Sequence, residues 1–304
     1  MPARGLVTLA GRLRPAPGRL PAAPREACPG AAGGRCRPGF AALDAATRPG
    51  DGARMDSGPM FLELPLPPPF RAVLSTRIGG VSPRPWDTQN HGTATGDTPE
   101  RVGRNAELLA AEAGFPGRAG LAGWATVTQV HGRRCVRVAG PGRAGEADAL
   151  WTDVPGLPLA VRVADCAAVA VADPDRGLVG LAHAGWRGAA AGVVPSLVRA
   201  MGVAPARCSA AISAHLGACC FEVGPEVAEA FGGRCCEPRP GGRFRLDLGA
   251  ALRQELEALG VPAGQIHSEG GCTACRAELF FSHRRDRGAT GRMVTVAWIR
   301  PAGG

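Results

Sequence analysis

The chain has 304 residues, a net charge of +9 and no lysine or tyrosine. Because lysine is absent, a nucleoside-triphosphatase P-loop and a Schiff-base lysine are both excluded. No apolar run is long enough to span a bilayer, and residues 1–54 carry six of the nine surplus positive charges. We therefore expect neither a membrane nor a nucleic acid as a partner.

Residues 1–58 are rich in alanine, glycine, proline and arginine, without a sustained period of 2 or 3.6 residues. Such a segment buries too little apolar surface to offset the entropy of ordering, so we expect a disordered leader. A start assigned too far upstream, with Met55 or Met60 as the real one, a dispensable tail and a transit peptide all stay open. The short first apolar stretch contains arginine, which argues against export. We expect a cytoplasmic protein with mostly reduced cysteines.

The first long element is a helix over 99–113, with Thr98 as its N-cap and Gly114 as its stop. An alternating strand over 126–130 follows and places His131 at its end. A histidine just after a strand can point into a site at the edge of a sheet.

Residues 159–181 alternate and predict a hairpin centred near Asp175. In that hairpin Cys166 pairs with Ala184, next to His183. Paired strands lie about 5 Å apart, so the cysteine and the histidine can reach one ion. A bulge or bend is needed, because only directly opposite side chains share a face.

The remaining elements complete an α/β fold of mixed α+β type. We expect further strands over 71–75, 210–214 and 293–299, and helices over 189–201, 225–231 and 246–259. Together these elements predict a layered sandwich with a mixed sheet and flanking helices, in a single domain over residues 59–304.

Three ligand-type residues, His131, Cys166 and His183, stand at strand ends beside glycine or alanine. Two nitrogens and one sulfur suit zinc, and a site with three protein ligands keeps a fourth position for activated water. Copper is the weaker candidate, because six histidines are too few for the several histidine clusters of a multicopper enzyme.

Seven motifs carry a resemblance to a known family. They are Thr76-Arg77-Ile78-Gly79-Gly80-Val81-Ser82, Gln129-Val130-His131-Gly132, Asp148-Ala149-Leu150, Ala164-Asp165-Cys166, His183 to Gly188, Cys219 to Gly224, and Phe280-Phe281-Ser282-His283-Arg284-Arg285-Asp286. In this order they resemble the YfiH/DUF152 family over residues 60 to 300. Its members were once called laccase-domain proteins or multicopper polyphenol oxidases, and are now regarded as zinc-dependent purine nucleoside phosphorylases.

The resemblance implies that His131, Cys166 and His183 bind zinc. It also implies phosphorolysis of adenosine, inosine, guanosine and methylthioadenosine, with adenosine deamination by activated water as a second activity. Purine nucleosides and phosphate are then the partners of a monomer or homodimer. Three alternatives remain: a peptidoglycan editing factor, a copper-type polyphenol oxidase and a catalytically silent zinc-binding protein.

Phosphorolysis needs a cationic anchor for phosphate. The candidates are Arg77, Arg187, Arg284 and Arg292, and we favour Arg77 and Arg187 because each lies beside a glycine-rich turn. Asp165 adjoins Cys166, where it could act on the substrate or orient a metal ligand. We favour the orienting role.

Two features depart from the family pattern or stand apart from it. Members usually carry an Ile-Gly-Pro repeat where this chain has Ser213-Ala214-His215. We interpret His215 as an exposed loop residue rather than a catalytic addition. Cys272 and Cys275 form a CxxC motif with no second pair in the sequence, which is a weak signal for redox chemistry or a second metal.

Overall fold

The computed structural model describes residues 58–115 and 120–301. Apart from Gly58, the expected leader lies outside the described residues. The described residues belong to one compact unit with two six-stranded sheets and one three-stranded sheet. This confirms a mixed α/β single domain.

The first six-stranded sheet joins segments from both ends of the described chain. Its order is β1 (Phe61–Leu64), β2 (Phe70–Ser75), β15 (Met293–Ile299), β7 (Leu159–Val163), β3 (Ala125–Thr128) and β5 (Gly142–Glu146). β15 runs antiparallel to β2 and β7, whereas β3 runs parallel to β7 and β5. The sheet is therefore mixed, as expected.

The second six-stranded sheet carries the hairpin predicted from the sequence. Its order is β14 (Ile266–Ser268), β10 (Ser209–Ile212), β8 (Ala167–Asp173), β9 (Leu178–Ala184), β6 (Ala149–Thr152) and β4 (Cys135–Arg137). Every residue of β8 and β9 is buried, which explains their nearly continuous apolar sequence.

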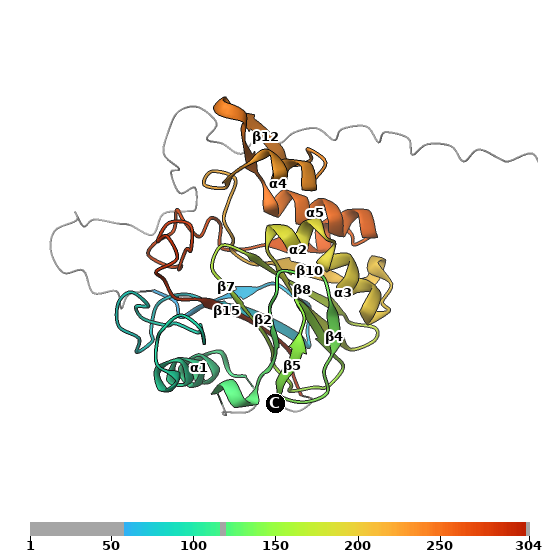
Figure 1. Ribbon diagram of the computed structural model, residues 1–304. Helices are drawn as coiled ribbons and strands as arrows, with labels where there is room; N and C mark the ends of the chain where they lie inside the picture. Colours follow the sequence, from blue (N-terminus) through green and yellow to red (C-terminus); the bar gives the residue numbers. More distant parts are fainter. Residues whose placement is uncertain (1–57, 116–119, 302–304) are drawn as a thin grey trace, which may run out of the picture. The chain divides into compact units, whose positions relative to one another are not determined.

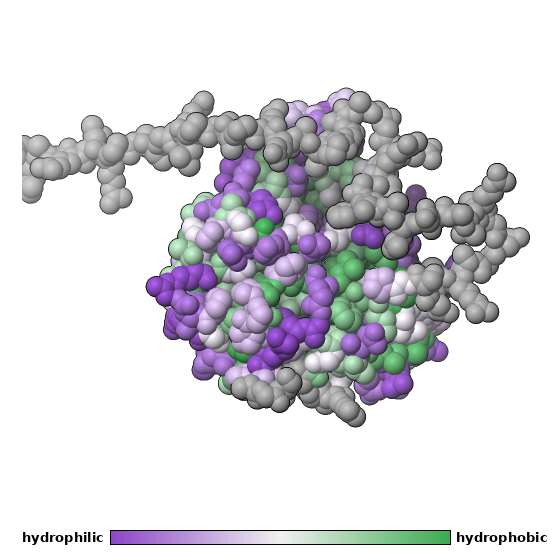
Figure 2. All heavy atoms as spheres, turned by 180° about the vertical axis from the view of Figure 1, so that it is seen from behind, coloured by the Kyte–Doolittle hydropathy of each residue, from purple (hydrophilic) through white to green (hydrophobic). Residues whose placement is uncertain are grey.

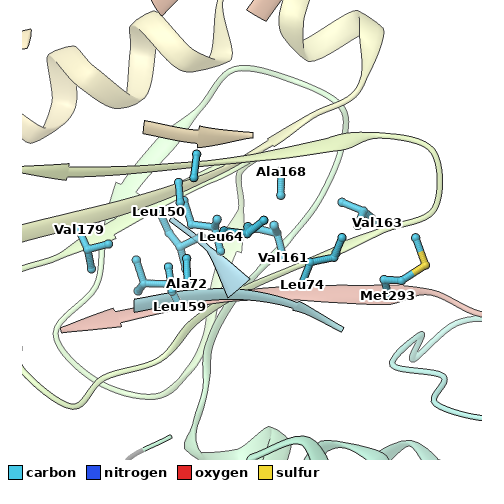
Figure 3. Close-up of a cluster of buried hydrophobic side chains, with 14 of the residues drawn as sticks. Leu64, Ala72, Leu74, Leu150, Leu159, Val161, Val163, Ala168, Val179 and Met293 are labelled. Atoms are coloured by element: carbon cyan, nitrogen blue, oxygen red, sulfur yellow. The ribbon is translucent and has the colours of Figure 1, made fainter. Parts of the chain in front are cut away.

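The two large sheets pack face to face around the main core. Leu74, Val161 and Met293 contribute from the first sheet, and Leu150 and Val179 from the second (Figure 3). Side chains alternate across a strand, so the opposite residues of the same strands face outward toward helices.

Helices cover both outer faces, which makes four layers (Figure 1). α1 (Pro99–Ala113) packs on the first sheet in a cluster with Trp124 and Trp298. α3 (Val193–Met201) and α5 (Leu248–Leu259) pack on the second sheet. Leu248, Leu252 and Leu256 form the buried face of α5.

Short elements complete the fold. They are α2 (Trp186–Ala190), α4 (Pro225–Ala230), the third sheet of β11 (Glu222–Val223), β13 (Arg243–Leu246) and β12 (Cys236–Arg239), and 3-10 turns Gly120–Gly123, Pro205–Arg207, Pro240–Gly242 and Ala263–Gln265.

The helix ends follow the sequence at α1 but not at 189–201. Thr98 Oγ1 accepts the Arg101 N–H, and Gly114 is left-handed, as predicted. The single helix over 189–201 is wrong, because left-handed Gly192 separates α2 from α3. Pro195 then falls in the first turn of α3, where a missing N–H costs no helical hydrogen bond.

Hydrophilic residues dominate large parts of the face shown in Figure 2, and apolar residues are interspersed among them. Among the described residues, the large hydrophobic side chains classed as exposed are Val81 and Val130. None of the described helices is long and apolar enough to cross a membrane.

Candidate metal centre

His131, Cys166 and His183 converge on one point. One ligand atom from each lies within 4.8 Å of the other two. The histidine rings are 4.9 Å apart, with an interplanar angle of 76°. His131 follows β3, Cys166 precedes β8 and His183 lies in β9, so neighbouring ends of both large sheets supply the three side chains.

The β8–β9 hairpin brings Cys166 and His183 together, with a register one residue away from the expected one. Ala167 pairs with Ala184, so Cys166 lies opposite Gly185 rather than Ala184. The required bend is at Asp165, whose φ of 86° is left-handed. This bend turns Cys166 out of the regular strand and toward His183.

Gly185 leaves the space in which an ion can sit. A Cβ built at this position would lie 2.8 Å from Cys166 Sγ and 3.1 Å from His131 Cδ2. The two imidazoles and the thiol surround a small space, here called the cradle, which a single methyl group at Gly185 would fill. These ligand types fit a zinc ion.

Asp148, which the sequence analysis left without a role, fixes two of the three candidate ligands. Its buried carboxylate lies 2.8 Å from His183 Nδ1 and accepts the backbone N–H of His131 at 2.9 Å. It also accepts the N–H of Gly132 at 2.6 Å. Holding Nδ1 in this way leaves His183 Nε2 for a metal. The Asp148-Ala149-Leu150 motif was the only sequence signal.

Cys166 and His183 shift each other's pKa in opposite directions. Burial raises the pKa of Cys166, but hydrogen bonds with His131 and His183 outweigh it and lower the pKa to about 6. Burial lowers the pKa of His183, but bonds with Asp148 and Cys166 raise it to about 9. At neutral pH Cys166 is therefore a thiolate, the form that binds metals.

The three side chains lie in the wall of a cavity of about 610 Å³, which suits a small organic ligand. Trp186, Leu216 and Phe221 form apolar parts of the wall. Its charged side chains are Arg143, Arg162, Asp165, Arg284 and Arg292. Positive charge is in excess, so the cavity favours an anionic ligand.

Two arginines predicted as phosphate ligands, Arg284 and Arg292, line this cavity. Burial lowers the pKa of Arg292, while the charges of Asp165 and Cys166 oppose that shift. Among the described residues, the Arg292 guanidinium donates only through NH1, to the Thr290 and Gly291 carbonyls. Arg284 donates NH1 to the Glu222 carbonyl and lies over Phe221.

The two favoured phosphate ligands lie elsewhere. Arg77 forms an ion pair with Asp87 at 3.1 Å and donates to the Ala277 carbonyl, outside the cavity wall. Arg187 is exposed, stacks on Trp186 at 4.3 Å and is not part of the wall.

Asp165 connects loops instead of contacting a ligand side chain. Its carboxylate accepts Thr273 Oγ1 at 2.7 Å and the Arg284 N–H at 2.6 Å. It therefore joins the bend before Cys166 to the segment that carries Arg284.

The expectation of an exposed His215 is wrong. Its side chain is buried, Nδ1 lies 2.8 Å from the Ser213 carbonyl, and His215 is not part of the cavity wall. Ser213 Oγ accepts the Ala168 N–H at 2.8 Å. The changed loop is thus built into the end of β8 by hydrogen bonds that the sequence alone did not indicate.

Comparison with known proteins places the whole described unit in one family. Residues 71–300 match a family model described as "Multi-copper polyphenol oxidoreductase laccase". Purine nucleoside phosphorylase YlmD of Geobacillus stearothermophilus is 38% identical over 251 residues, covering 75% of this chain and 90% of the relative. Purine nucleoside phosphorylase YfiH of Escherichia coli is 36% identical over 241 residues, covering 77% and 96%.

Solved structures agree with this likeness. The crystal structure of YlmD from Geobacillus stearothermophilus gives a TM-score of 0.72 at 35% identity, covering 76% of this chain and 92% of that chain. Bacillus licheniformis hypothetical protein YfiH gives 0.71 at 34%, covering 76% and 93%.

Proposed function

Since the chain belongs to the laccase-domain (YfiH/DUF152) family, we propose that it is a zinc-dependent purine nucleoside phosphorylase. The observation that carries the proposal is the convergence of His131, Cys166 and His183 in the wall of an arginine-lined cavity. The names of the relatives supply the nucleoside, and the excess of positive charge supports phosphate as its co-substrate.

His131, Cys166 and His183 would hold the ion, with Asp148 orienting His183. Zinc bound there would supply a Lewis acid and lower the pKa of a water molecule, which is the chemistry that adenosine deamination requires. Arg284 and Arg292 bind the phosphate that attacks the sugar carbon of the N-glycosidic bond. Trp186 and Phe221 offer aromatic surfaces for the purine. The nucleosides proposed are adenosine, inosine, guanosine and methylthioadenosine.

Copper-type phenol oxidation fits these residues less well. A blue-copper centre adds a weak methionine ligand to two histidines and a cysteine, and no methionine lines the cavity in the described part of the chain. The four histidines outside the triad, His91, His215, His267 and His283, belong to no cluster of possible metal ligands in the described part of the chain. The described residues therefore offer no second histidine cluster for further copper ions.

The test is an assay of inosine and adenosine with and without phosphate, combined with metal analysis. It compares the wild type with Cys166→Ala, and uses Cys208→Ala as the matched control, because Cys208 is a buried thiol away from the cavity. We expect phosphate-dependent release of hypoxanthine and adenine by the wild type and the control. Cys166→Ala should lose this activity and one equivalent of zinc.

The other outcomes are distinct. Zinc binding without base release or conversion of adenosine to inosine would contradict the proposal and favour a silent zinc-binding protein. Bound copper with phenol turnover would restore the oxidase interpretation.

A further inference from the structure

A second cluster of possible metal ligands lies outside the triad. It consists of Cys219, Cys220, Cys272 and Cys275, whose sulfur atoms all lie within 4.8 Å of one another. The sequence showed one CxxC motif without a partner pair. The fold supplies that partner, because the loop between β10 and β11 meets the loop between β14 and β15.

We propose that these four cysteines form a closed structural site that binds one zinc ion through four thiolates. Cys275 Sγ lies 3.5 Å from Cys219 Sγ and 3.4 Å from Cys220 Sγ. Four sulfurs about 2.3 Å from a tetrahedral zinc are separated from one another by about 3.8 Å. The observed spacings are close to that value and well beyond the roughly 2.05 Å of a disulfide.

Cys272 to Cys275 form a turn, here called the knuckle. Burial raises the pKa of the Cys272 thiol, but backbone hydrogen bonds with Cys275, Gly217 and Ala274 lower it. Such bonds stabilise a thiolate without placing a positive side chain in the site. Arg276 NH1 and Arg285 NH1 donate to the Gly270 and Thr273 carbonyls and so brace the loop beside the knuckle. Glu278 and Asp286 pair with these two guanidinium groups.

Close approach of the two loops requires a glycine at 217. A Cβ there would lie 3.0 Å from Cys272 Cβ and 3.4 Å from Cys219 Sγ. A short parallel bridge between His215 and Cys272 aligns the two loops. The Thr273 N–H donates to the His215 carbonyl at 2.9 Å. Backbone pairing therefore positions the thiols before any ion binds.

The proposed ion would join two parts of the cavity wall. Leu216 and Phe221 line the cavity on either side of the Cys219-Cys220 pair. Thr273, inside the CxxC motif, bonds to Asp165 beside Cys166. The proposed role is structural, because four protein ligands leave no open position for substrate.

The test uses the full-length Cys166→Ala protein, so that the triad contributes no thiolate ligand and nucleoside turnover plays no part. We expect one equivalent of zinc in this background. Cobalt substitution should give the absorption of a tetrahedral tetrathiolate ion. At zinc saturation, a thiol reagent should count four fewer reactive cysteines than after chelation.

The matched variants change one adjacent cysteine pair at a time. Cys219→Ser/Cys220→Ser should lose the remaining equivalent, whereas Cys235→Ser/Cys236→Ser should keep it. Cys275→Ser changes an exposed residue and provides a second variant if the double variant does not fold. It should lose the tetrathiolate cobalt absorption.

Three results would overturn the proposal. They are no bound metal in the Cys166→Ala protein, bound metal with all four thiols still reactive, and a disulfide between any two of these cysteines in protein purified without a reductant or an added oxidant.

Discussion

The Asp148 carboxylate connects two ligands that come from different sheets. It accepts the His131 N–H after β3 and lies against His183 in β9, so both positions depend on one side chain. An asparagine would keep the size but would present amide hydrogens to groups that already donate.

Asp148→Asn should therefore lower zinc affinity at the triad by about 10- to 100-fold. A competition titration with a chromophoric chelator measures this change. Asp153→Asn is the matched control, because Asp153 pairs with Arg137 at the surface. Equal affinities in the two variants would mean that Asp148 does not orient the ligands.

The arginines that line the cavity are not the ones that the sequence favoured as phosphate ligands. Glycine-rich turns favoured Arg77 and Arg187, yet Arg284 and Arg292 line the cavity. Arg292→Gln should raise the KM for phosphate by at least about tenfold with a smaller change in kcat, because a charge-assisted contact to a bound substrate is lost. Initial rates at saturating inosine measure it.

Arg187→Gln is the comparison for that experiment and should leave the phosphate KM unchanged, because its guanidinium is exposed above Trp186. The opposite ranking of the two variants would support the glycine-turn argument.

At the scale of elements, the ends of the β8–β9 hairpin explain what the sequence did and did not predict. Alternating apolar residues identify both strands. The one-residue register error arises because the turn covers residues 174–177 and is therefore centred between Asp175 and Arg176. Asp173 stays in β8 and pairs with Leu178, while its carboxylate accepts the N–H groups of Asp175 and Arg176. The Asp173 carboxylate caps the turn, so the turn begins one residue later than its amino-acid composition suggests.

Gly185, between β9 and α2, gives a prediction at this scale. Gly185→Ala adds a methyl group 2.8 Å from Cys166 Sγ, which should lower zinc affinity at the triad at least about tenfold and cost about 1–3 kcal/mol in stability through overpacking. Zinc titration and thermal unfolding measure the two effects.

The control for that variant is Gly103→Ala in α1, where no atom lies within 4 Å of the new Cβ. It should leave zinc binding unchanged and raise stability by about 0.5–1 kcal/mol, as alanine does in a helix. Unchanged zinc binding in Gly185→Ala would show that the cradle tolerates a methyl group.

At the scale of the whole molecule, the sequence did not indicate which residues far apart along the chain lie in contact. The three triad residues were found because each has its own motif. Asp148 with His183, and the Cys219-Cys220 pair with Cys272 and Cys275, meet only through the order of strands. β15, the last strand, lies between β2 and β7 in its sheet, and no local pattern indicates such an order.

The first described residues are held to the folded unit by hydrogen bonds. The Met60 carbonyl accepts the Thr76 N–H at 2.8 Å, and the Pro59 carbonyl accepts Thr76 Oγ1 at 2.7 Å. β1 then pairs with β2 over four residues and buries Leu64. These contacts fix the β1 edge of the first sheet. Strands β7 and β3 of the same sheet contribute residues to the cavity wall.

A chain that begins at Met55 keeps all of these contacts, and every residue of the cavity wall lies between Gly92 and Arg292. It should therefore match the full chain in zinc content, nucleoside phosphorolysis and unfolding temperature. A chain that begins after β1, at Pro65, should lose at least about 2 kcal/mol of stability, since Leu64 and the β1–β2 hydrogen bonds are removed. Lost activity in the Met55 chain would assign residues 1–54 a part in the reaction or in folding.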